Sequence, residues 1–164
     1  MIRMIQTKTA ARAKSYFNES LLQSDYYVNE QELRGSFRGM IATRLGIHGD
    51  VTKNVFHALC ENVNPVTGKS LTPKQINNRT VGYDINFHCP KSVSVLHALS
   101  KDAHILDAFQ KSVLDTMADI EKDAKTRVRK NGKDENRGSD GLIYADFIHQ
   151  TARPVKGEKP DPHL

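Results

Sequence analysis

The chain has 164 residues, and 24 Lys and Arg stand against 19 Asp and Glu, which gives a formal net charge of +5. This length fits one domain, and 38% hydrophobic and 26% charged residues exclude a wholly disordered protein. No apolar run approaches the ~18 residues that a membrane-spanning helix needs, and two cysteines are too few for a disulfide framework or a cysteine-based zinc site. The start of the chain lacks the apolar core and cleavage site of a secretory signal. We therefore expect a cytoplasmic protein with no membrane insertion and a mildly basic surface.

In the first half of the chain, the spacing of apolar residues predicts several elements. These are a short strand over 1–7, a helix over 8–21, a loop over 34–47 that closes with a short helix over 38–45, and a helix over 51–63. Asp50 is a suitable N-cap for the last of these, because its carboxylate can accept a backbone N–H of the first turn. Residues 64–79 are rich in Pro, Gly, Asn and Thr and should form an exposed loop.

In the second half, Val81, Tyr83, Ile85 and Phe87 alternate with polar residues, which predicts a strand with one buried face. The other expected elements are a helix over 91–99 that begins near Pro90, a long helix over 102–129, a charged loop over 131–140 and a strand over 142–149. Three prolines after Thr151 argue against regular structure there. The sequence therefore predicts an α+β fold, with an antiparallel sheet covered mainly on one face by helices.

Basic residues cluster between Lys122 and Arg137. One interpretation is a solvated helix end followed by a polar loop. The other is an edge that contacts phosphates, whose binding would weaken steeply as salt rises. Spacing alone leaves both open.

Tyrosines and histidines are the residues that could carry chemistry. Tyr16 and Tyr26 lie on polar segments near the start, and His149 ends the last predicted strand. A tyrosine nucleophile needs help, because a phenol with a pKa of ~10 is ionised only about once in a thousand at neutral pH. A nearby base or a cation beside the attacked phosphate would supply it. A carboxylate such as Asp84 on a central strand, opposite a histidine-bound metal, would suit this task, although spacing cannot show that these groups converge.

Four segments resemble the conjugative relaxases of the TrwC/TraI-like (MobF) class, which belong to the HUH endonuclease superfamily. They are Ser15-Tyr16-Phe17 with Ser24-Asp25-Tyr26-Tyr27; Leu45 to Val51 with Phe56 to Leu59; Gly82 to Ser94, which is similar to the family's Gly-x-Asp-x-x-Phe-Ser-x-Pro-Lys-Ser-Val-Ser; and Phe147 to Arg153 with Asp161 to Leu164. Their order and spacing span essentially the whole chain. The resemblance implies that residues 1–164 are the N-terminal part of a relaxase domain.

The resemblance implies a mechanism in which a tyrosine attacks single-stranded origin-of-transfer DNA and forms a 5′-phosphotyrosine link. Tyr16 would be the initiating nucleophile and Tyr26 a second one, while Asp84 would orient a ligand histidine or accept a proton. His149 would be the first ligand of a divalent metal, Mg or Mn, with Zn as a further candidate. Tyr27, Lys91 and Arg153 are candidates for DNA binding. Other relaxosome or secretion-system proteins are expected as further partners.

The chain departs from the family pattern in three places. Phe17 replaces the second tyrosine of a pair, and His88 replaces a serine of the signature. His88 could be a partly exposed strand-end residue or an extra DNA or metal contact. The family's His-x-His pair follows the Asp-Pro-x-Leu stretch, so only one of three expected metal ligands lies before Leu164.

Two functions in different classes are therefore expected. One belongs to the longer protein of which this chain would be the N-terminal part, and the other to this chain by itself. The first is a DNA nicking and strand-transfer enzyme that initiates conjugative plasmid transfer. The second is a non-catalytic, single-stranded DNA-binding fragment whose metal site is incomplete, so that it binds metal weakly or not at all. An unrelated α+β domain is the remaining alternative.

Overall fold

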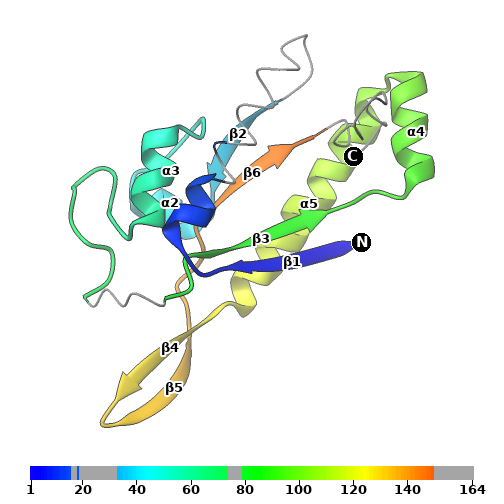
Figure 1. Ribbon diagram of the computed structural model, residues 1–164. Coiled ribbons are helices and arrows are strands. Elements are labelled where there is room, and N and C mark those ends of the chain that lie inside the picture. The colour runs from blue at the N-terminus through cyan, green and yellow to red at the C-terminus, as the bar shows by residue number, and fades with distance from the viewer. Residues whose placement is uncertain (16–17, 19–32, 74–78, 150–164) are drawn as a thin grey trace.

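The computed structural model describes residues 1–15, 18, 33–73 and 79–149. Within these residues, six strands form three antiparallel pairs (Figure 1). The pairs are β1 (Ile2–Thr7) with β3 (Gly82–Phe87), β2 (Leu33–Arg38) with β6 (Tyr144–Ile148), and β4 (Lys125–Lys130) with β5 (Lys133–Gly138). The helices with bounds are α2 (Met40–Arg44), α3 (Lys53–Cys60), α4 (Lys91–Ser100) and α5 (Ala103–Asp123), and residues 10–15 are also helical. The predicted α+β class with antiparallel strands and helices is confirmed.

The best-packed region lies where β2 meets α2 and α3. Phe37, Ala42 and Ile47 are buried there, and half-buried apolar residues surround them. Those neighbours are Leu45, Val51, Val55, Phe56, Leu59, Ile143 and Ala145. Because Phe37 pairs directly with Ala145 of β6, this core joins the first third of the chain to its last strand.

A carboxylate and two glycines fasten α5 to this core. The Glu121 carboxylate accepts the backbone N–H of Met40 at 2.8 Å and of Leu142 at 2.6 Å. Gly39 and Gly141 flank this contact with φ of 97° and 123°. A Cβ on Gly39 would lie 2.3 Å from the Leu142 carbonyl oxygen, so the chain segments approach this closely only because both residues are glycine.

Three sequence-based predictions of local structure are wrong. The expected loop at 34–38 is strand β2, whose partner β6 lies about 110 positions away and leaves no local signal. Thr52, not Asp50, caps α3, because its side chain accepts the N–H of Val55. The long helix ends at Asp123, and the predicted helix end and charged loop instead form the β4–β5 hairpin.

The hairpin turn explains the last of these differences. Asn131 and Gly132 both have positive φ, of 52° and 78°, as expected of a two-residue type I′ turn. In the view of Figure 1, this hairpin projects from the body as a separate finger.

The described helices include none that is long and apolar enough to cross a membrane.

Candidate functional site

Asp84 lies in the middle of β3, and its side chain is half-buried. It pairs with Ile5 of β1, and the ladder closes at its far end, where the Met1 amino group donates to the His88 carbonyl oxygen at 2.9 Å. Opposite residues of an antiparallel pair share a face, so Asp84 lies with Ile5 and Asn86 on one face of the sheet. The predicted strand is confirmed. The expected buried face is not, because Tyr83 on the other side is 59% exposed.

His149 directly follows β6 and is exposed. The strand that leads to it is fixed by Asp146, whose carboxylate accepts the Ser36 N–H at 3.0 Å and Arg38 Nε at 2.7 Å. These two bonds stabilise the pairing of β6 with β2 three residues before His149. Sequence reasoning missed the Asp146–Arg38 pair. The only signal was the charged Asp146 within a predicted strand, and nothing near it in the sequence indicated its partner.

Tyr144 is the one tyrosine that the structure describes in detail near the core. Burial, and then the Glu121 carboxylate, raise the pKa of its phenol, while Arg38 opposes them. A raised pKa makes the phenolate scarcer still, so Tyr144 is a poor nucleophile.

Tyr16, Tyr26, Tyr27 and Arg153 lie outside the described residues. The helix that leads toward Tyr16 is anchored at Lys14, which pairs with Glu61 just after α3. The Lys14 ammonium lowers the pKa of the Glu61 carboxyl, as a hydrogen-bonded cation does. The structure therefore ties the helix over residues 10–15 to the end of α3, and the predicted convergence of Tyr16, Asp84 and His149 stays a prediction.

The described residues do not by themselves make a metal site. No group of three or more His, Cys, Asp or Glu side chains that could hold an ion is present among them. Asp84 belongs to the β1–β3 pair, whereas His149 follows the β2–β6 pair. A metal at His149 would need ligands from elsewhere.

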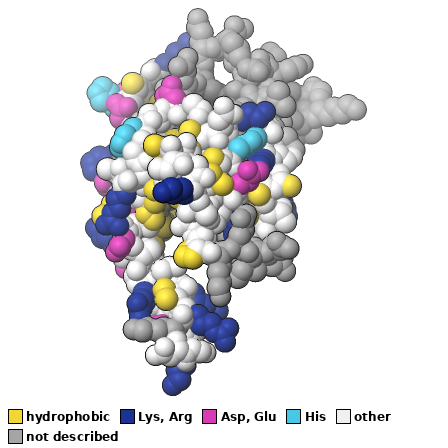
Figure 2. Space-filling view, turned by 90° about the vertical axis from the view of Figure 1, so that its left-hand side faces the viewer, with side chains coloured by type: hydrophobic (Ala, Val, Ile, Leu, Met, Phe, Trp, Pro, Cys, Tyr) yellow, Lys and Arg dark blue, Asp and Glu magenta, His cyan; other side chains and the backbone are white. Residues whose placement is uncertain are grey.

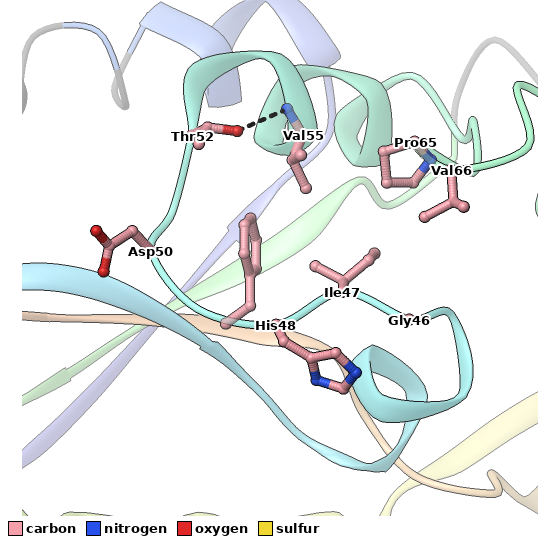
Figure 3. Close-up of a pocket in the computed structure, with 9 residues that line it drawn as sticks. Gly46, Ile47, His48, Asp50, Thr52, Val55, Pro65 and Val66 are labelled. Carbon is pink, nitrogen blue, oxygen red and sulfur yellow. Dashed lines mark hydrogen bonds between the residues drawn. The ribbon is translucent and has the colours of Figure 1, made fainter.

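A hollow of about 180 Å³ lies between the segment 46–52, the start of α3 and residues 65–66 (Figure 3). Ile47, Val55, Pro65 and Val66 point toward one another in this view, with His48 and Asp50 at the margin. None of the predicted site residues lines it. Its lining combines apolar side chains with the polar His48, Asp50 and Thr52.

Positive charge gathers on the β4–β5 hairpin, as Figure 2 shows at the lower end of the molecule. Lys125, Arg127 and Arg129 are exposed and alternate along β4, so they share one face of the hairpin. On the other face, Arg137 pairs with Glu135 at 3.0 Å. Asp134, opposite Arg129 in the ladder, also lies on the face of Lys125, Arg127 and Arg129, and Lys133 adds positive charge to the other face. The hairpin is thus basic on both faces, and we call Lys125, Arg127 and Arg129 the basic face.

The start of α4 is a second positive feature. Lys91 is the exposed first residue of α4, after Pro90 at the N-cap position. A lysine there adds its charge to the positive end of the helix dipole, which makes this helix start attractive to anions.

The family model of the TrwC relaxase matches residues 10–164. The chain belongs to the TrwC relaxase family. It is 34% identical over 156 residues to the multifunctional conjugation protein TraI of Escherichia coli K12, with 93% of this chain covered. A second TraI from Escherichia coli is 33% identical over 155 residues.

Solved relaxase structures have the same fold. A metal-free TrwC in complex with oriT DNA is 26% identical with a TM-score of 0.71 and covers 99% of this chain. A copper-bound TrwC complex is also 26% identical, with a TM-score of 0.75. The chain spans 54% and 55% of those two chains and 8% of the E. coli K12 TraI.

Proposed function

We propose that this chain is the N-terminal part of a relaxase domain that nicks and rejoins one strand of DNA at an origin of transfer. The observation that carries the proposal is the match of 99% of the chain to TrwC in complex with oriT DNA. The β3 and β6 strands provide the supports that the mechanism needs, since Asp84 lies within one and His149 follows the other. The basic face and Lys91 favour a polyanionic partner.

Tyr16 is the proposed nucleophile. Its phenolic oxygen attacks phosphorus, the bond to the 3′ oxygen breaks, and the strand is left with a 3′-hydroxyl and a 5′-phosphotyrosine. The phenol proton must leave, and Asp84 is the group proposed to accept it or to orient a histidine. Tyr26 would make the second attack, which transfers the strand again.

The proposed cofactor is a divalent metal, and the proposed first ligand is His149. A metal-bound TrwC structure supports the class of cofactor, and magnesium or manganese fits phosphate chemistry, with zinc as a further candidate. When bound, such an ion neutralises charge on the attacked phosphate. The remaining ligands are proposed to lie on the His-x-His pair of the family, after the residues that correspond to Leu164.

Binding of the DNA is assigned to Tyr27, Lys91 and Arg153 together with the basic face. Arginines and lysines contact phosphates, and an aromatic ring gives an unpaired base a surface to stack on. The alternative function, a single-stranded DNA-binding module without cleavage, uses the same contacts. The two functions differ only in whether a covalent link forms.

The test is to incubate the chain with a single-stranded origin-of-transfer oligonucleotide and magnesium or manganese. A protein–DNA adduct on a denaturing gel that disappears in Tyr16→Phe and persists in Tyr83→Phe, whose ring is 59% exposed on β3, would support the enzyme. Retarded migration on a native gel without any adduct would favour the binding module. If neither an adduct nor retardation forms, the DNA role itself is wrong.

A further inference from the structure

The C-terminal end of α3 carries a charge that the helix itself does not favour. The helix ends at Cys60, and Glu61 occupies the C-cap position. The last carbonyl groups of a helix form the negative end of its dipole, where a cation is stabilising and a carboxylate is not. The position of Glu61 is therefore explained by what its side chain contacts rather than by the needs of the helix.

Two cationic side chains from separate segments meet at this end of α3. Lys14, in the helix over residues 10–15, pairs with the Glu61 carboxylate, and Arg79 donates to the Cys60 carbonyl oxygen. The Lys14 side chain is only 24% exposed, so its aliphatic stem packs against the protein while its ammonium group makes the pair. We call the Glu61 carboxylate and the Cys60 carbonyl the α3 anchor.

The charges around Glu61 favour Lys14 as its partner at neutral pH. His57 lies one helical turn before Glu61, but burial, and then Lys14 and Lys53, lower the pKa of its imidazole. The ring is therefore uncharged near neutral pH. The hydrogen bond from Lys14 lowers the pKa of the Glu61 carboxyl, so both members of the pair are ionised.

The segment that leads to β3 is also joined to the end of β1. The Gln6 side-chain amide donates to the Thr80 hydroxyl at 2.8 Å, and the Val81 N–H donates to the Thr7 carbonyl oxygen at 2.9 Å. Because β1 continues into the helix over residues 10–15, these bonds and the α3 anchor act on the same two segments. One segment precedes β3, and the other bears Lys14.

These two segments lead to the two groups of the proposed chemistry. Lys14 lies two positions before Tyr16, and Arg79 lies five positions before Asp84. We propose that Lys14 and Glu61 are positioning residues for the nicking reaction, which hold the segment of the nucleophile in place relative to the strand of the proton acceptor. The inference rests on the proposed function, because it takes both roles from there. A displacement of roughly 1 Å can slow a reaction about a hundredfold, so losing the pair should affect the chemistry more than DNA binding.

The variant Glu61→Gln tests this, because it removes the pair with little change of shape and makes the chain more positive by one charge. Electrostatics alone would let this variant bind DNA at least as tightly, so slower reaction could not come from lost binding. With a single-stranded origin-of-transfer oligonucleotide and manganese in excess, we expect the covalent adduct to form roughly tenfold more slowly. The affinity measured on a native gel should not fall.

A charge swap and a matched control complete the experiment. Lys14→Glu should also slow the adduct, and Lys14→Glu with Glu61→Lys should restore the rate to within roughly threefold, because the two positions act as a pair. The control is Asp115→Asn, which adds the same charge but breaks a pair with Lys111 inside α5. It should change neither rate nor affinity.

An adduct that forms equally fast in Glu61→Gln and in the unsubstituted chain would overturn the inference and leave the proposed function intact. A charge swap that does not restore the rate would overturn it too, because Glu61 would then act by another route than Lys14. Parallel loss of adduct, affinity and stability to urea in Glu61→Gln would show a structural role only. If the unsubstituted chain binds DNA but forms no adduct, the enzyme function fails, and the inference fails with it.

Discussion

At the scale of single residues, the glycines beside Glu121 set the strictest demands on the sequence. Gly39 allows the start of α2 to approach Leu142, and Gly141 allows the same segment to pass Met40, where an added Cβ would lie at 2.6 Å. Glu121 then joins α5 to both segments through two backbone N–H groups. The loop before β6, and hence the strand that leads to His149, is held in place by this arrangement.

Gly39→Ala should strongly destabilise the chain. The new methyl group would lie 2.3 Å from a backbone oxygen that cannot move without breaking the Glu121 contact, and the φ of 97° is strained for alanine. Gly46→Ala is the matched control, with a φ of 70° and no atom within 4 Å, so it carries only the backbone strain, about 1 kcal/mol. Urea denaturation measures both. Equal losses in the two variants would show that the close approach at Gly39 does not matter.

At the scale of elements, the start of α5 combines a cap with a titrating pair. The Asp102 carboxylate accepts the His104 N–H at 2.9 Å and lies 2.8 Å from its Nδ1 atom. The hydrogen bond to Asp102 raises the pKa of His104 from 6.5, and the same bond lowers the pKa of Asp102 from 3.8. The first turn of α5 is therefore most stable between about pH 3.8 and pH 6.5.

The stability contributed by protonated His104 should be fully present below about pH 6.5 and disappear as pH rises through the raised pKa. The contribution of Asp102 should disappear at the acid end, as pH falls through its lowered pKa. An NMR titration of the His104 ring should give a midpoint above 6.5 that falls in Asp102→Asn. A midpoint at or below 6.5 in the unsubstituted chain would contradict the pairing.

The β4–β5 hairpin carries a prediction about salt. If the basic face contacts phosphates, Arg127→Gln with Arg129→Gln should reduce the slope of log affinity against log salt by roughly one unit per arginine. The reason is that each phosphate contact releases about one counterion from the DNA, so binding with fewer contacts depends less on salt. Lys111→Gln with Lys122→Gln is the control, because these ammonium groups already pair with Asp115 and Asp119 on α5. An unchanged slope in the arginine variant would show that the hairpin does not touch DNA.

Local periodicity predicted the helices and strands whose own residues show a regular apolar spacing. Strand β3, the start of α4 and most of α5 follow from alternation and from spacings of three and four. Strand β2 could not be found this way, because its partner strand β6, with Ala145 opposite Phe37, lies about 110 positions away. The hairpin could have been found, since Asn131-Gly132 is a strong turn signal. The apolar spacing of α5 continued through Ala124 and Val128 and concealed it.

The candidate site likewise contains residues that the sequence could assign and residues that it could not. Asp84 and His149 were assigned through the family resemblance, and the structure adds the strand that carries each. The Asp146–Arg38 pair needed coordinates, because a salt bridge across 108 positions has no local pattern. The positions of Tyr16 and Tyr26 lie outside the described residues, so their assignment depends on the resemblance alone.

At the scale of the whole molecule, the proposed ligand count predicts weak metal binding. A single proposed ligand, His149, should bind manganese with a Kd no tighter than about 1 mM, so 1 mM metal would stabilise the fold by at most about 0.4 kcal/mol. For a chain of this size that is a Tm shift of about 1–2 °C. His149→Ala should remove even this shift in calorimetry. A rise of about 10 °C would mean that the chain holds a complete ligand set.

The pairing of distant strands also affects the synthesis of the chain. β1 cannot form its ladder until β3 exists, and Phe37 finds its partner strand only after Ala145 has been made. At ~5–20 residues per second, the ribosome needs roughly 5–20 s to span that interval. During this time β1 and β2 emerge without their partner strands, so their native pairing must wait until β3 and β6 have been made.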